Sequence, residues 1–206
     1  GQLHSFHTMG NVTTPLGRLS ADVTMHRRAS SQYKISGMVD TDNLHLGNIL
    51  DINKLGELDS HIVADGVVGA GSIVADVDVK VNSIGVMGRG FSDIKAQGSI
   101  NDKSYLAHVR SNDKNLRFDL SGLVDLGREI PSYEVMLNLE HADLHKLDIN
   151  KRDSLSVASL ELGLDVDGRT LDDLDGSISI ANMHYLYPGG ELTSDRLSAD
   201  IRRYDD

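Results

Sequence analysis

Apolar and polar residues alternate with a period of two along most of the chain. In the run 72–83, Ile73, Ala75, Val77, Val79 and Val81 share one face, while Asp, Lys and Asn residues fall between them. This period is typical of a half-buried β-strand, because successive side chains point to opposite faces. Comparable runs cover residues 17–26, 116–126, 132–140, 159–168 and 176–185. The last of these predicts a single row of Ile178, Ile180, Asn182 and His184.

Turn signals separate these runs at near-regular spacing. They stand at Asp65-Gly66, Asn101-Asp102, Asn112-Asp113, Asp167-Gly168 and 188–190. A helical period is never sustained over three turns, and the best helical pieces are corners at 43–50, 142–148 and 170–174. We therefore expect an all-β chain of twelve to fifteen short antiparallel strands with short helical corners. Such strands must form a curved sheet, a sandwich or a barrel.

One phrase occurs twice, about one hundred residues apart. Residues 33–50 read YKISGMVDTDNLHLGNIL, and residues 133–149 read YEVMLNLEHADLHKLDI. Both are strand-like runs that end in an Asx-Leu-His step, which we interpret as a corner between blocks of strands. The repetition predicts that residues 1–206 are one elongated β-domain, or a fragment of a longer repeat-like protein. Both ends look cut, so we expect an internal piece of such a protein.

Composition limits the classes of function. The formal net charge is −11, which disfavours nucleic-acid binding because an acidic surface repels phosphate. The chain has no cysteine, so disulfides, zinc–thiolate sites and cysteine nucleophiles are excluded. It also lacks tryptophan, and because glycan sites usually carry aromatic platforms, a glycan-acting enzyme is disfavoured without being excluded.

Candidate chemistry is sparse. His141 and His145 are four residues apart, but a metal site needs a third ligand, and we interpret them as solvated corner residues. The run DVDGRTLDDLDG from Asp165 places neither Gly nor Glu where a calcium loop of the EF-hand type requires them. Gly-rich runs at 69–74 and 85–91 have no following long helix, and no G-x-S-x-G motif occurs. We expect no catalytic residue, no metal site and no cofactor, although chance pairs of carboxylates leave a glycosidase interpretation open.

The strand–corner phrases resemble a known family. The pattern of strand, acidic spacer, Leu, short turn and Leu, in VDTDNLHLGNIL and LEHADLHKL, is similar to the TamB translocation and assembly module family within the AsmA-like group, in its Bacteroidetes-type form. LGELDSHIVADG, DLSGLVDL and GRTLDDLDGSISIANMHY extend the resemblance over about residues 33–187. The resemblance implies a sheet folded lengthwise into a groove with an apolar interior, called a β-taco. A closed β-sandwich is the alternative fold.

The resemblance also implies a function and a location. A member of this family would be periplasmic and anchored in the inner membrane by a segment absent from this chain. It would be a non-enzymatic scaffold that moves phospholipid between the inner and outer membranes, or that helps outer-membrane proteins assemble. Its partners would be phospholipid acyl chains and, through regions outside this chain, an outer-membrane barrel protein.

From the alternation we predict the residues that would line such a groove. They are the inward rows Val77, Val79, Val81, Leu116, Phe118, Leu120, Val135, Leu137, Leu139, Leu160, Leu162 and Leu164. Two alternative functions stay open: a surface β-domain that binds protein or glycan through its loops, and, third, a glycan-acting enzyme.

Overall fold

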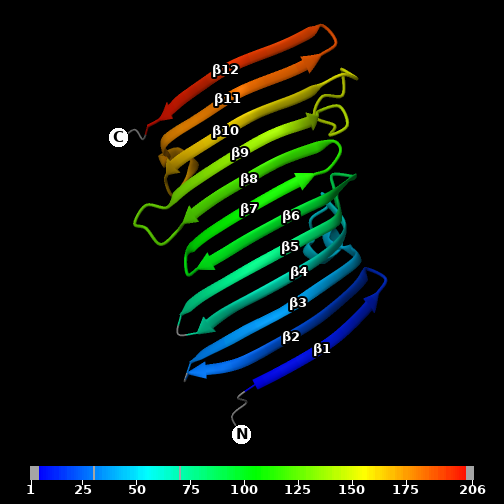
Figure 1. Ribbon diagram of the computed structural model, residues 1–206, viewed down its shortest axis with the longest axis vertical. Helices are drawn as coiled ribbons and strands as arrows, with labels where there is room; N and C mark the ends of the chain where they lie inside the picture. Colours follow the sequence, from blue (N-terminus) through cyan, green and yellow to red (C-terminus); the bar gives the residue numbers. More distant parts are fainter. Residues whose placement is uncertain (1–4, 30, 70, 203–206) are drawn as a thin grey trace. The chain divides into compact units, whose positions relative to one another are not determined.

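A computed structural model describes residues 5–29, 31–69 and 71–202. The described residues form twelve β-strands, one short α-helix and one short 3-10 helix (Figure 1). The chain divides into two compact units, Gly1–Asp102 (unit 1) and Lys103–Asp206 (unit 2). The expected all-β class is confirmed.

Unit 1 is an antiparallel meander in which each strand pairs with the next strand in sequence. A single helix, α1 (Leu46–Leu50), lies in the corner between its third and fourth strands. The strands are β1 (Ser5–Thr14), β2 (Gly17–Ala29), β3 (Gln32–His45), β4 (Leu55–Gly69), β5 (Ser72–Val86) and β6 (Arg89–Asn101).

Unit 2 repeats this arrangement of six strands in sequence order. Its long corner also follows the third strand, and the 3-10 helix η1 (Leu171–Asp173) lies in the next connection. The strands are β7 (Ser104–Asn112), β8 (Leu116–Asp125), β9 (Ser132–Asp143), β10 (Val157–Asp167), β11 (Asp175–Tyr187) and β12 (Gly190–Ile201). The two repeated phrases therefore occupy the same position in the two units, at the third strand and the corner after it.

The sheet of each unit is open. Each strand packs mainly against its hydrogen-bonded neighbours, and among the described residues no second sheet packs over either unit. Only Ala142 and Val166 are buried apolar residues in the described chain, with 2% and 3% of their surface exposed. A sandwich would bury whole rows of Leu and Val, so the closed alternative is wrong, and the arrangement is consistent with a curved, open sheet.

β-Bulges interrupt the ladders and change which face a residue occupies. The register between β10 and β11 shifts between Ser159 and Glu161, where Asn182 adopts a positive φ of 50°. An extra residue reverses the alternation beyond it. The predicted row is therefore wrong after Ile180: the Asn182 side chain donates a hydrogen bond to Glu161 on the opposite face.

The helical corners predicted from the sequence are only partly confirmed by the structure. Residues 43–50 contain α1, and residues 170–174 contain η1, which Thr170 and Asp173 cap reciprocally. In the expected helix at 142–148, residues 142–143 end β9 and residues 144–148 form hydrogen-bonded turns, and the Asp143 carboxylate accepts a hydrogen bond from the Lys146 amide. The expected turn at Asp65-Gly66 is wrong, because both residues continue β4 and pair with β3 and β5.

Among the described residues, no helix is both long and apolar enough to cross a membrane.

Candidate binding face

Each unit carries an apolar face built by cross-strand rows. In unit 1, Ile62 of β4 pairs with Val39 of β3 on one side and with Val79 of β5 on the other. Val77 lies opposite Ala64, and Val81 lies opposite Ile94 of β6. Residues in register on neighbouring antiparallel strands project to the same face. The three valines predicted for the groove therefore share the apolar face of unit 1.

Unit 2 brings the other nine predicted residues onto its own apolar face. One rung joins Leu120, Leu137, Leu162 and Ile180 across four strands. The rungs beside it hold Phe118 with Leu139 and Leu160, and Val135 with Leu164 and Ile178, while Leu116 pairs with the buried Ala142. These rungs form one continuous apolar surface on unit 2.

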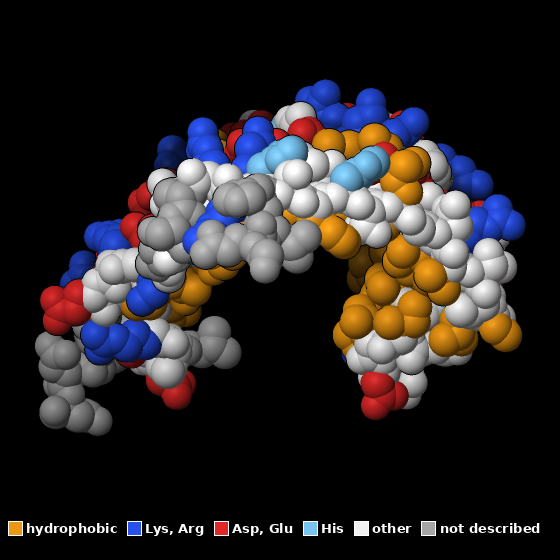
Figure 2. Space-filling view, turned by 90° about the horizontal axis from the view of Figure 1, so that it is seen from below, with side chains coloured by type: hydrophobic (Ala, Val, Ile, Leu, Met, Phe, Trp, Pro, Cys, Tyr) orange, Lys and Arg blue, Asp and Glu red, His pale blue; other side chains and the backbone are white. Residues whose placement is uncertain are grey.

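The apolar faces are only half-buried. All twelve predicted residues have intermediate exposure, so no described element seals them from solvent and none of them projects freely. Apolar side chains gather on one surface of the strand layer, and charged side chains gather on the opposite one (Figure 2). A contiguous apolar surface that a protein leaves uncovered usually marks a binding site.

Sequence reasoning missed part of this face at the end of unit 2. Ile178 and Ile180 of β11 pair with Ala199 and Leu197 of β12. These residues, with Ser198, line a shallow hollow of about 150 Å³. The alternation in sequence places Ile178 and Ile180 in one strand row, but the predicted groove does not include them. The alternation in 197–201 carries the same signal for β12.

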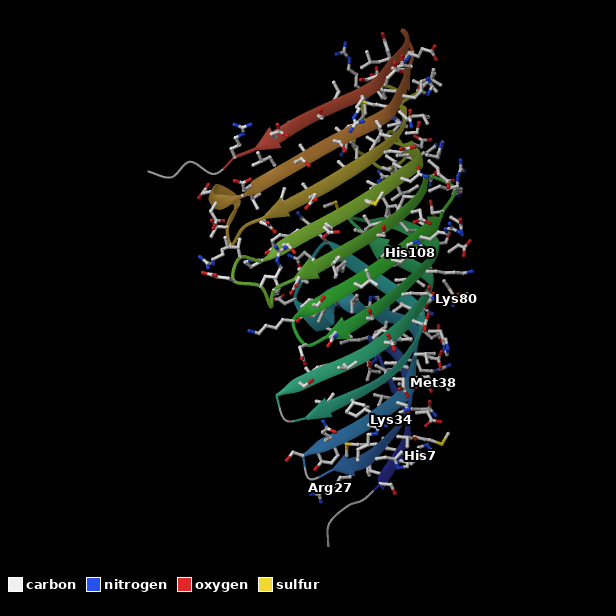
Figure 3. The ribbon with its side chains drawn as sticks, turned by 60° about the vertical axis from the view of Figure 1, so that its left-hand side comes forward. His7, Arg27, Lys34, Met38, Lys80 and His108 are labelled. Carbon is white, nitrogen blue, oxygen red and sulfur yellow. The ribbon has the colours of Figure 1, made fainter. Side chains whose placement is uncertain are left out.

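The opposite face of each unit is polar and crossed by ion pairs. In unit 1, Lys34, Met38 and Lys80 project from this face (Figure 3). Several pairs join a histidine to a carboxylate on the neighbouring strand at short N···O distances: His7–Asp22 at 2.7 Å, His61–Asp40 at 2.6 Å, His108–Asp119 at 2.7 Å and His184–Glu191 at 2.9 Å. Polar pairs of this kind are satisfied on a solvated face and need no covering layer.

The Asp119 carboxylate, on the polar face, is hydrogen-bonded to both His108 and Arg110. A hydrogen bond from the His108 ring, supported by Arg110, lowers the pKa of Asp119 below its ordinary value, although partial burial acts in the opposite direction. Arg110 donates from Nε and Nη2 to the second oxygen at 3.0 and 2.8 Å. In unit 1, hydrogen bonds from the Ser83 hydroxyl and the Asn43 amide likewise lower the pKa of Asp59.

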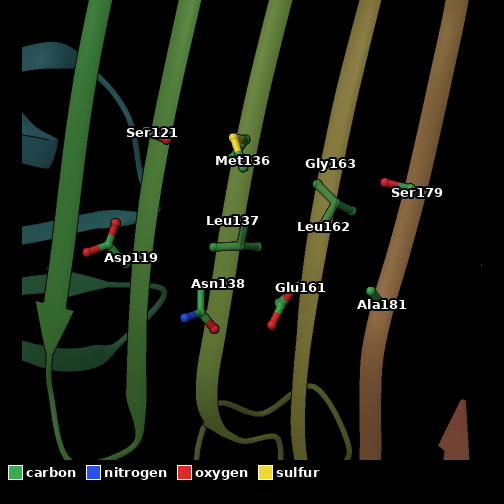
Figure 4. Close-up of a pocket in the computed structure, with 10 residues that line it drawn as sticks. All are labelled: Asp119, Ser121, Met136, Leu137, Asn138, Glu161, Leu162, Gly163, Ser179 and Ala181. Atoms are coloured by element: carbon green, nitrogen blue, oxygen red, sulfur yellow. The ribbon is translucent and has the colours of Figure 1, made fainter. Parts of the chain in front are cut away.

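A hollow of about 330 Å³ lies on the polar face of unit 2 (Figure 4). Asp119, Asn138 and Glu161 stand on one rung of β8, β9 and β10, so the two carboxylates are two strand spacings, or about 10 Å, apart. A glycosidase needs one carboxylic acid with a raised pKa. The pKa of Asp119 is lowered, and Glu161 is exposed and bonded to Asn182. The hollow therefore supplies no general acid at Asp119.

The histidines considered for metal binding are separated. His141 lies in β9, whereas the ring of His145 lies 3.3 Å from the carbonyl oxygen of Asn150 in the corner. Among the residues that the structure describes, no group of three or more His, Asp or Glu side chains is placed to hold a metal ion.

Comparison with known proteins gave no relative: no family model, curated protein or solved structure matches the chain.

Proposed function

We propose that this chain is a segment of a non-enzymatic envelope scaffold that shields phospholipid acyl chains on its apolar face. One observation carries the proposal: in each unit, rows of Leu, Ile and Val form an apolar face that no described element covers. Water contact with such a face is unfavourable by about 25 cal/mol per Å² of apolar surface. A ligand with long hydrocarbon chains relieves this cost without requiring any polar partner.

The chemistry of the face favours an acyl chain over a polar ligand. The rung Leu120–Leu137–Leu162–Ile180 contains only aliphatic side chains. Its neighbour adds Phe118, Leu139 and Leu160. Neither rung offers a side-chain hydrogen bond, so recognition depends on contact area. The strand–corner pattern that resembles the TamB family supports a periplasmic location and a role in moving phospholipid between the two membranes or in outer-membrane protein assembly.

Site-specific photo-crosslinking tests the proposal. A photoreactive amino acid placed at Leu137 or Leu162, in the chain exported to the periplasm of a bacterial host, should give phospholipid adducts detectable by mass spectrometry. Met136 is the matched control, because it is the neighbour of Leu137 on β9 but is exposed on the polar face. Equal labelling at Met136, or the absence of lipid adducts at both leucines, would reject acyl-chain binding and favour a surface domain that binds protein or glycan.

A further inference from the structure

Exposed aliphatic side chains gather at one end of the strands of unit 1. Three connections lie there: the turn between β1 and β2, the corner between β3 and β4, and the turn between β5 and β6, all at the right-hand end of these strands in Figure 1. We call this the apolar end and define it by five side chains and their exposed fractions: Leu16 (37%), Ile49 (49%), Leu50 (52%), Ile52 (44%) and Met87 (65%).

Backbone hydrogen bonds join the three connections into one edge. The His45 amide donates to the Leu16 carbonyl at 2.8 Å, and the Met87 amide donates to the Lys54 carbonyl at 2.6 Å. Within the corner, the Ile52 amide donates to the Gly47 carbonyl at 2.9 Å. The connections that carry the exposed side chains are therefore tied together through the backbone.

The opposite end of unit 1 has a different chemistry. Its described turn residues are polar or glycine: Ser31, Gly71 and Asp102. Ile73 and Val74 are exposed nearby, but they belong to strand β5. Among the described residues of unit 1, connections that carry exposed aliphatic residues thus lie at one end.

Local charge in the corner between β3 and β4 is balanced. The chain has a net charge of −11, yet residues 46–54 contain one acidic and one basic residue, Asp51 and Lys54. Side chains that reach the boundary between headgroups and acyl chains should carry no unpaired charge with them, because moving an unpaired charge into an apolar environment is costly. From the exposed aliphatic tips and this balance, we propose that the apolar end of unit 1 inserts into the interfacial region of a phospholipid bilayer.

The small size of the apolar end favours a bilayer over a protein as its partner. A stable protein–protein interface engages about 20–30 residues on each side. The apolar end offers five exposed apolar side chains on three connections that backbone hydrogen bonds join. A bilayer accepts such side chains without complementary shape, and its affinity grows with the apolar area that is buried.

Unit 2 shows a related corner between β9 and β10. Ile149 and Leu155 are exposed there, with 69% and 41% of their surface accessible. Lys146, Lys151 and Arg152 are exposed in the same corner, and Lys151 pairs with Asp148 at 3.4 Å. Exposed aliphatic residues beside cations are typical of segments that lie in a membrane interface. Exposed aliphatic residues therefore recur at the corner of the second repeated phrase.

This inference goes beyond acyl-chain binding on the apolar face, because it concerns the connections at the strand ends. Flotation with phosphatidylcholine vesicles tests it on the 206-residue chain. The variant I49S/L50S/I52S should lower the apparent partition coefficient at least tenfold. The control variant M38S/V63S/V74S removes side chains of similar exposure, 44%, 40% and 47%, on the polar face and away from the apolar end, and should change partitioning less than twofold. Equal loss in both variants, or no vesicle binding by the parent chain, would overturn the proposal.

A measurement of insertion depth tests the proposal without relying on the stability of the triple variant. The chain has no cysteine, so Leu50→Cys and the control Met38→Cys each accept a single environment-sensitive dye. Vesicles should shift the emission of the dye at position 50 to shorter wavelength, and a quencher in the lipid should reduce it, with little change at position 38. A dye at position 50 that stays in water contradicts insertion. Adding Val79→Asp, on the apolar face, separates the two proposals: it should abolish any lipid bound on that face of unit 1 but leave the dye response at position 50 intact.

Discussion

Leu137 of β9 lies directly opposite Leu162 of β10, and both side chains stay half-exposed on the apolar face of unit 2. Replacing a fully buried leucine by alanine costs about 2–5 kcal/mol. Because each of these leucines has water on one side, we expect Leu162→Ala to lower the free energy of unfolding by only about 1 kcal/mol, measured by urea denaturation.

Met136 provides the comparison for that measurement. It is next to Leu137 in β9 but exposed on the polar face, so Met136→Ala should change the free energy of unfolding by at most about 0.5 kcal/mol. A loss above about 3 kcal/mol for Leu162→Ala would mean that another layer covers the apolar face.

Asp119 should make unit 2 sensitive to acid. Its pKa is lowered in the folded state, chiefly by the hydrogen bond with His108. A lowered pKa stabilises the fold above the pKa of the unfolded chain, and this stabilisation is lost as the pH falls through the folded-state pKa. We expect Asp119→Asn to cost up to about 1 kcal/mol at pH 7, the upper range for exposed ion pairs. Urea denaturation should show this difference shrinking as the pH is lowered through the acid range.

Asp165 serves as the matched carboxylate. It lies on the polar face in β10, and among the described residues its side chain has no hydrogen bond or ion pair. Asp165→Asn should therefore change stability little at pH 7. An Asp119→Asn variant whose destabilisation is the same at every pH would contradict the assigned cause.

Strand positions and faces could be predicted from sequence because each depends on local alternation. The row Leu160, Leu162 and Leu164 lies on one face of β10 as its period of two predicts. The predicted row that runs through Asn182 is wrong, because a β-bulge depends on how a strand pairs with its neighbour and not on the residues of that strand alone. Burial also required the structure: Ile49 and Leu50 are aliphatic, yet both are exposed in the corner.

Gly47 should be essential to the corner of unit 1. A Cβ atom at this position would collide with the carbonyl oxygen of Leu55 and lie 2.8 Å from that of Ile52. Backbone atoms cannot move aside cheaply, so we expect Gly47→Ala to lower the free energy of unfolding by more than about 2 kcal/mol. Gly90 in β6 is the control, since a Cβ there meets nothing within 4 Å and Gly90→Ala should be tolerated. Similar urea midpoints for the two variants would argue against a tightly packed corner.

Asn150 organises the corresponding corner of unit 2. Its side-chain nitrogen lies 3.1 Å from the Asp153 carboxylate, the Ser156 hydroxyl and the Tyr185 hydroxyl, and its oxygen accepts a hydrogen bond from the Arg152 amide. Ser156 is completely buried, so it cannot replace a lost partner with bulk water.

We therefore expect Asn150→Ala to cost about 1–3 kcal/mol, the range for leaving a buried polar group less well satisfied. Asn138→Ala is the control, because Asn138 is exposed on the polar face and, in the described chain, its side chain makes no hydrogen bond. Calorimetric unfolding of the two variants measures the difference. Equal transition temperatures would show that the corner folds without this network, and that its shape comes from Asp143 and the backbone turns alone.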